Sequence, residues 1–119
     1  DCVITSTQSN SFDICMGNGS GIFASATNYA IYGSQGAPSI VDIDSDGFLD
    51  IVFFYDEGGQ FHIYYGDGSG SYGDFVSDYT SPSTRGLVVG DFDNDGDIDI
   101  ATVSYSLGSI LVHPNLLFP

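Results

Sequence analysis

The chain contains an acidic motif that occurs twice, 49 residues apart, and this repeat constrains its fold more than any other feature. Residues 42–51 read DIDSDGFLDI, and residues 91–100 read DFDNDGDIDI. The same offset relates residues 12–21, FDICMGNGSG, to residues 61–70, FHIYYGDGSG. The 119 residues therefore hold about two and a half copies of one unit. A period of this length is typical of propellers, solenoids and other arrays in which neighbouring units are stacked.

Each unit reads as short β-strands separated by polar or glycine-rich turns. The first two strands of the units are expected at residues 2–5 and 12–15, 51–55 and 61–65, and 100–103 and 110–112. Third strands are expected to begin near Phe23 and Tyr72, and fourth strands at residues 39–41 and 87–89. No window shows a convincing helical period. We therefore predict an all-β fold of four-stranded antiparallel blades of β-propeller type.

The offset also divides the chain into repeats. Residues 1–41 form a first repeat that lacks the start of its own acidic loop, residues 42–90 form the second, and residues 91–119 form a partial third. A propeller usually needs more blades than these. We therefore expect the chain to be either a piece of a larger propeller or a subunit that assembles with copies of itself.

The acidic motif has the residue types and spacing of a calcium-binding loop. Carboxylates occupy loop positions 1, 3, 5 and 9, and glycine at position 6 permits a sharp turn. The expected carboxylate ligands are Asp42, Asp44, Asp46 and Asp50 in one loop and Asp91, Asp93, Asp95 and Asp99 in the other. The backbone carbonyl at position 7, Phe48 or Asp97, can add a ligand. Neither loop contains a thiolate or an imidazole, so the pattern predicts two Ca²⁺ sites rather than sites for a soft metal.

Two other interpretations of the acidic motif were considered. An EF-hand is excluded because position 12 is Phe53 or Thr102 rather than glutamate, and strands rather than helices are expected on both sides. The simpler alternative is a pair of Asp- and Gly-rich turns without an ion. We favour calcium because the whole nine-residue pattern occurs twice at one period.

Composition excludes several classes of partner. Arg85 is the only basic residue besides histidine, and the net charge is −15, which argues against nucleic acid or an anionic membrane surface. Hydrophobic residues make up 42 % of the chain, too many for a disordered acidic tail. No stretch is apolar for the length of a membrane-spanning helix, so membrane insertion is not expected.

The acidic loops and the glycine turns resemble the FG-GAP/VCBS repeat, the blade of integrin-α-type β-propellers. The resemblance is carried by the loop at residues 42–50, by Asp50-Ile51-Val52 and by residues 17–23, GNGSGIF. Gly36-Ala37-Pro38 also precedes the first loop, whereas the second unit departs there with Arg85-Gly86-Leu87. The resemblance implies calcium ligation by the eight aspartates, an extracellular setting, and a role in adhesion, carbohydrate binding or scaffolding.

Two cysteines and one asparagine suggest covalent modifications. Pairing the first two strands about a turn at residues 7–10 makes Cys2 and Cys15 cross-strand partners. A disulfide between them would indicate an oxidising compartment; the alternative is two small buried residues in a strand pair. Asn18-Gly19-Ser20 is an N-glycosylation sequon on an expected exposed turn, although Asp67 at the equivalent position indicates that the turn needs a polar residue in any case.

We predict an extracellular, calcium-binding structural or adhesion module. No enzymatic activity is expected, because His62 and His113 fall on strands without a partner motif and the clustered carboxylates are assigned to ions. One alternative is a self-assembling subunit of an extracellular fibre or coat, and another is a carbohydrate-binding, lectin-like propeller fragment. The expected partners are further blades, other copies of the chain, a glycan or a matrix protein.

Overall fold

A computed structural model describes residues 1–6, 8–31, 36–55 and 58–115, and this part of the chain is all β. Its ten strands are β1 (Cys2–Ser6), β2 (Ser11–Cys15), β3 (Thr27–Ala30), β4 (Ser39–Val41), β5 (Asp50–Tyr55), β6 (Gln60–Gly66), β7 (Tyr72–Tyr79), β8 (Thr84–Gly90), β9 (Asp99–Ser104) and β10 (Ser109–His113). None of the described residues forms an apolar helix long enough to cross a bilayer.

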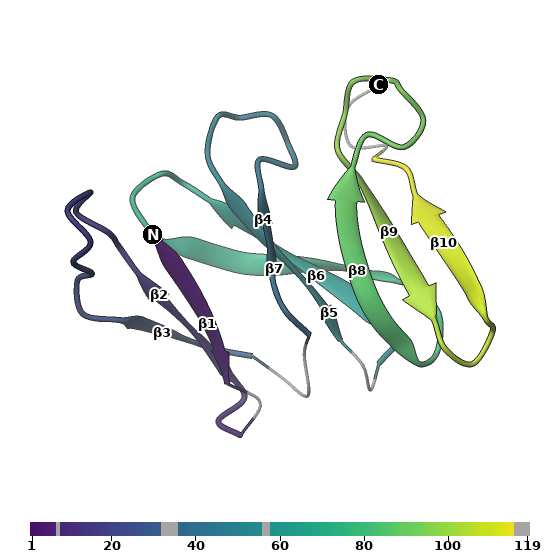
Figure 1. Cartoon of the computed structure of the whole chain (residues 1–119), viewed down its shortest axis with the longest axis horizontal. Helices are drawn as coiled ribbons and strands as arrows, with labels where there is room; N and C mark the ends of the chain where they lie inside the picture. Colours follow the sequence, from purple (N-terminus) through teal and green to yellow (C-terminus); the bar gives the residue numbers. More distant parts are fainter. Residues whose placement is uncertain (7, 32–35, 56–57, 116–119) are drawn as a thin grey trace.

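The strands form three antiparallel sheets that lie side by side in chain order (Figure 1). The first sheet is β1-β2-β3, the middle sheet is β4-β5-β6-β7, and the third sheet is β8, β9 and β10 with β9 at its centre. The predicted all-β class and antiparallel pairing are confirmed. The predicted four strands are present only in the middle sheet, and the described sheets form an open row rather than a closed ring.

Each complete acidic loop closes a hairpin inside a sheet. The loop at residues 42–50 joins β4 to β5, with Val41 paired to Asp50, and the loop at residues 91–99 joins β8 to β9, with Gly90 paired to Asp99. The strand expected at the end of one repeat therefore belongs to the sheet of the next repeat. The repeat boundaries at residues 42 and 91 consequently lie within sheets.

The third strand of the first sheet begins later than expected. β3 starts at Thr27 rather than near Phe23, which forms only an isolated bridge with Gly17. The intervening chain is occupied by a wide turn, in which Ala24 N–H donates to Met16 O at 2.8 Å. The equivalent strand of the middle sheet, β7, begins at Tyr72 as predicted.

The sheets pack face to face through two apolar clusters. Between the first and middle sheets, Phe12 contacts Phe53 and Tyr64 at ring-centroid distances of 5.2 and 5.1 Å. The second cluster joins the middle and third sheets and contains Ile43, Val52, Phe61, Ile63 and Ile100. Side chains alternate between the two faces of β5, which explains why its residues 50–53 are all buried. Each large apolar side chain buried in this way contributes about 1.5–3 kcal/mol to folding.

Candidate metal centres

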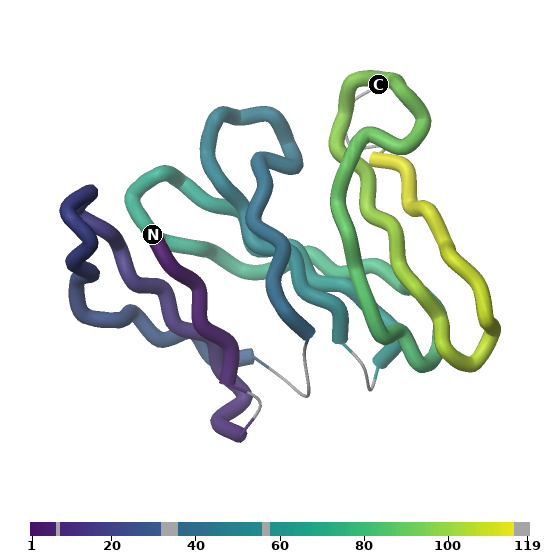
Figure 2. The backbone as a smooth tube through the Cα atoms, in the orientation of Figure 1, coloured from purple at the N-terminus to yellow at the C-terminus, as the bar shows by residue number. Residues whose placement is uncertain are grey.

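The two acidic loops lie at the same edge of the row of sheets (Figure 2). In both loops the glycine at position 6 has a left-handed backbone, with φ of 93° at Gly47 and 100° at Gly96. Position 4 is also left-handed, with φ of 59° at Ser45 and 64° at Asn94. The predicted sharp turn at the glycine is confirmed, and the turn at position 4 is an addition that the spacing did not reveal.

The first loop brings three carboxylates together. Asp42, Asp44 and Asp50 each place one oxygen within 4.8 Å of the others. Backbone amides of the loop hold the first carboxylate: Gly47 N–H donates to Asp42 Oδ2 at 3.0 Å, and Asp46 N–H donates to Asp42 Oδ1 at 3.1 Å. Asp46 N–H also lies 3.2 Å from Asp44 Oδ1. Hydrogen bonds from the loop backbone therefore orient the carboxylates of Asp42 and Asp44 without the help of an ion.

The second loop repeats this arrangement. Asp91, Asp93 and Asp99 place oxygens within 4.8 Å of one another. Asn94 N–H donates to Asp91 Oδ1 at 2.7 Å, and Gly96 N–H donates to Asp91 Oδ2 at 3.2 Å. Among the residues that the structure describes, these two clusters bring carboxylate oxygens close enough together to hold a metal ion.

The aspartates at position 5 lie outside these groups of three. The Asp46 carboxylate accepts a hydrogen bond from Phe48 N–H at 2.8 Å, and the Asp95 carboxylate accepts one from Asp97 N–H at 3.0 Å. Both aspartates are exposed. Ligation by Asp46 and Asp95, and by the carbonyls at position 7, stays a prediction.

The aspartate at position 9 has a structural role besides its place in the cluster. Asp50 is fully buried, and its two oxygens accept hydrogen bonds from Ile43 N–H at 2.9 Å and Gly66 N–H at 2.8 Å. Ile43 lies in the loop, whereas Gly66 ends β6. The carboxylate therefore ties the loop to the far end of the neighbouring strand.

The bond from the backbone 16 residues later recurs at both other equivalent positions, and at Asp99 the bond from the loop recurs as well. Asp99 is fully buried and accepts from Phe92 N–H and Asn115 N–H, each at 2.8 Å. Asp1 accepts from Gly17 N–H, also at 2.8 Å. Gly17, Gly66 and Asn115 follow the 49-residue offset, so the repeat contained a signal for this bridge that the sequence analysis did not use.

The pKa values of Asp50 and Asp99 are shifted in opposite directions. Burial raises the pKa of Asp50, and repulsion by Asp44 and Asp46 adds to the rise. At Asp99 the hydrogen bond from Asn115 N–H is the largest influence, and it lowers the pKa. A cation in the first loop would relieve the repulsion that acts on Asp50.

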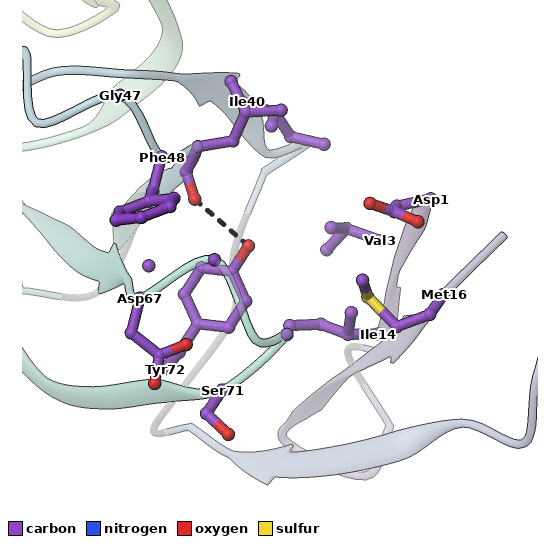
Figure 3. Close-up of a pocket in the computed structure, with 14 residues that line it drawn as sticks. Asp1, Val3, Ile14, Met16, Ile40, Gly47, Phe48, Asp67, Ser71 and Tyr72 are labelled. Carbon is purple, nitrogen blue, oxygen red and sulfur yellow. Dashed lines mark hydrogen bonds between the residues drawn. The ribbon is translucent and has the colours of Figure 1, made fainter.

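A cavity of about 200 Å³ lies beside the first loop, between the first and middle sheets (Figure 3). Phe48 from the loop and Tyr72 from β7 line it on one side, and Met16 and Asp1 line it on the other. Tyr72 donates its hydroxyl hydrogen to Leu49 O at 3.2 Å, the bond drawn in Figure 3. The acidic loop therefore forms one wall of this cavity.

The cysteines are paired in register but not bonded. Cys2 is the cross-strand partner of Cys15, as the sequence predicted. Both thiols are free and half-buried. The disulfide itself stays a prediction.

The sequon asparagine shapes its own turn. Asn18 is exposed, and its Oδ1 accepts hydrogen bonds from Ser20 N–H at 2.9 Å and from the Ser20 hydroxyl at 2.7 Å. Asp67 makes the same two bonds with Ser69, at 2.8 and 2.6 Å. This shared geometry explains why both turns carry an Asx side chain, and glycosylation of Asn18 stays a prediction.

The histidines pack against aromatic rings. His62 is stacked on Phe75 and Tyr55, at centroid distances of 4.2 and 5.7 Å. His113 contacts the Phe61 ring edge-on at 5.3 Å, and its Nε2 lies 3.3 Å from the Thr102 hydroxyl. Both imidazoles therefore pack against aromatic rings of the sheets.

The fold and the loops define a chain of stacked antiparallel sheets with acidic hairpin loops repeated at one edge. Residues 42–102 match the FG-GAP-like repeat, and the match covers half of the chain. The chain therefore belongs to the FG-GAP-like repeat family. Comparisons with curated proteins and with solved structures yield no match.

Proposed function

We propose that the chain is an extracellular structural or adhesion module in which each acidic loop binds one Ca²⁺. The observation that supports calcium is the convergence of three carboxylates within 4.8 Å in each of two loops related by the repeat. Membership of the FG-GAP-like repeat family supports the extracellular and adhesive parts of the proposal.

The donor set of each cluster fits calcium better than a soft metal. All three side chains offer carboxylate oxygens, which are the hard ligands that Ca²⁺ takes in sets of six to eight. Bidentate carboxylates, the backbone carbonyl at position 7 and water would complete the shell. The described clusters contain no histidine or cysteine, so zinc and copper are poorly matched.

A bound ion would stabilise the hairpins that the loops close. It would neutralise charge where three carboxylates are held together by the backbone, and it would bind the folded chain in preference to the unfolded one. Such binding stabilises a protein by about 2.7 kcal/mol when the ion is present at about 100 times its Kd. The ion would also fix the loop wall of the cavity beside Phe48 and Tyr72.

The adhesive part of the proposal assigns the chain a binding surface rather than a catalytic site. His62 and His113 are packed against aromatic rings, and the clustered aspartates hold loop amides. A matrix protein or a glycan is the proposed class of partner. Saturable, calcium-dependent binding on an array of glycans and matrix proteins would support adhesion, whereas no binding by the calcium-loaded chain would leave only the structural role.

Calcium titration into EDTA-treated protein tests the ion sites. Isothermal titration calorimetry is expected to give two ions per chain, and the melting temperature is expected to rise with calcium. The double variant Asp42→Asn/Asp44→Asn should retain one site, and Asp91→Asn/Asp93→Asn should retain the other.

The matched control is Asp74→Asn, an exposed position on β7 outside both loops, which should retain both sites. The calcium proposal is wrong if the parent chain gives no binding heat and melts at the same temperature in EDTA and in millimolar calcium. Loss of both sites in the control would show that the variants act through net charge rather than through ligation.

A further inference from the structure

The first and middle sheets each bury two side chains, from equivalent positions of the repeat, against the sheet that follows. Phe12 and Ile14 of β2 are buried against the middle sheet. Phe61 and Ile63 of β6, their equivalents 49 residues later, are buried in the cluster with Ile100 of the third sheet. We call this side of a sheet its outgoing face.

The third sheet has an outgoing face that nothing in the described chain covers. The equivalents of Phe61 and Ile63 are Ile110 and Val112, which are 71 % and 48 % exposed. Val103 is the cross-strand partner of Ile110, and with Val88 it extends the same apolar face. Four aliphatic side chains on one uncovered sheet are typical of an interaction surface.

The opposite side of a sheet, here called the incoming face, receives the preceding sheet. In the middle sheet its centre is Ile51, Phe53 and Tyr64, all buried against the first sheet. The equivalent positions in the first sheet are Cys2, Ile4 and Cys15. Ile4 is 51 % exposed, although its equivalents Phe53 and Thr102 are fully buried. The first and third sheets lie at the two ends of the row (Figure 1), and each leaves one face uncovered by the part of the chain that the structure describes.

We propose that the outgoing face of the third sheet docks on the incoming face of the first sheet of a second copy, head to tail. Both junctions inside the row join an outgoing face to an incoming face, and the proposed contact continues that packing between chains. It is heterologous, so association leads to a ring if the rotation closes and to a filament if it does not.

The incoming face of the first sheet also carries a carboxylate, because Asp13 is the cross-strand partner of Ile4. Asp13 accepts a hydrogen bond from Asn28 Nδ2 at 2.7 Å, and its equivalent in the middle sheet is His62. His62 packs on Tyr55 and Phe75 and is outside the cluster that meets the first sheet. Docking at Ile4 would bring the Asp13 carboxylate into the contact together with the Asn28 amide that donates a hydrogen bond to it.

Sedimentation velocity of the calcium-loaded full chain, over a wide concentration range, tests the proposal. The parent is expected to form species larger than a monomer that increase with concentration. Ile110→Asp and Ile4→Asp should each weaken association about a hundredfold or more, because each would bury a carboxylate in the contact. Leu107→Asp is the matched control, since Leu107 is exposed in the β9–β10 turn outside both faces.

A mixture of the two variants gives the sharpest result. The Ile4→Asp chain retains its outgoing face and the Ile110→Asp chain retains its incoming face, so an equimolar mixture should form one-to-one dimers that do not extend. A parent that stays monomeric, a mixture that stays monomeric, or association that is lost with Ile110→Asp but unaffected by Ile4→Asp would each overturn the proposal. The last result would indicate that two third sheets meet symmetrically.

Calcium binding and association are separable in these experiments. Both substituted isoleucines are exposed and lie outside the acidic loops, so the variants should bind two ions and melt like the parent. Failure of the calcium titration would overturn the proposed function, whereas failure of the mixing experiment would overturn only the docking.

Discussion

At position 9 of each acidic loop, one side chain serves the loop and the strand framework together. Asp99 contributes an oxygen to the candidate ion site and also accepts hydrogen bonds from Phe92 N–H and Asn115 N–H. Asn115 in turn donates from its side chain to Ile43 O at 2.8 Å, which links the end of β10 to the loop of the preceding sheet. Substitution of this aspartate should therefore affect the fold even without an ion.

We expect Asp99→Asn to lower the free energy of unfolding by about 1.5–3 kcal/mol in EDTA, because two hydrogen bonds to a buried carboxylate are weakened. Urea unfolding measures the change. Asp95→Asn is the control in the same loop, since Asp95 is exposed and accepts a local bond from Asp97 N–H. Equal midpoints for Asp99→Asn and the parent would show that the bridge contributes nothing to stability.

His62 makes the folded state sensitive to mild acid. Burial between aromatic rings lowers the pKa of His62 from its ordinary 6.5, so the unfolded chain binds a proton at a higher pH than the folded chain does. The stabilising contribution of the neutral imidazole is therefore fully present above pH 6.5 and is lost as the pH falls below that value.

We expect the melting temperature of the parent to fall between about pH 6.5 and pH 5, before most carboxylates titrate. His62→Phe keeps a ring between Tyr55 and Phe75 without the ionisable group, so its melting temperature should change less across the same window. The interpretation fails if the two proteins lose stability in parallel.

Among the elements, the acidic hairpin depends on its glycine for conformation rather than for space. A Cβ placed on Gly96 would meet no atom within 4 Å, but the residue has φ of 100°. Gly96→Ala should therefore cost about 1–2 kcal/mol through backbone strain alone. Urea unfolding in calcium measures the cost. Gly73→Ala on β7 is the control, because that site is equally open but lacks a left-handed φ.

A neutral Gly96→Ala would mean that the hairpin adopts another conformation when an ion is bound. A destabilising Gly73→Ala would mean that β7 is less tolerant than its open surroundings indicate.

The repeat predicted the hairpins and the acidic loops, but it did not assign every strand to its sheet. The offset aligned Asp42 with Asp91 and Asp50 with Asp99, and the carboxylates at positions 1, 3 and 9 do meet. The short apolar run at residues 39–41 has the same pattern whichever neighbour it pairs with, so its place beside β5 required the structure. The predicted start of β3 near Phe23 was wrong, because this apolar residue lies in an exposed turn.

In the whole molecule, acidic loops and apolar packing surfaces are spatially separated. The two acidic loops lie at one edge of the row (Figure 2). The central strands β5 and β6 of the middle sheet are buried against both neighbouring sheets. The exposed carboxylates of the two loops therefore lie outside the two apolar clusters that join the sheets. The uncovered faces at the two ends of the row therefore interrupt an otherwise repeating pattern of contacts.

The 49-residue register of the bridging aspartates also has a consequence for how such chains change length. Asp1, Asp50 and Asp99 bond to Gly17, Gly66 and Asn115, so every bridge spans the same number of residues. If the chain gains or loses one whole 49-residue period, each bridging amide again lies opposite an aspartate at the equivalent position. This holds wherever in the repeat the inserted or deleted segment begins. Genetic duplication or excision of a period would thus lengthen or shorten the array without a new hydrogen-bonding scheme.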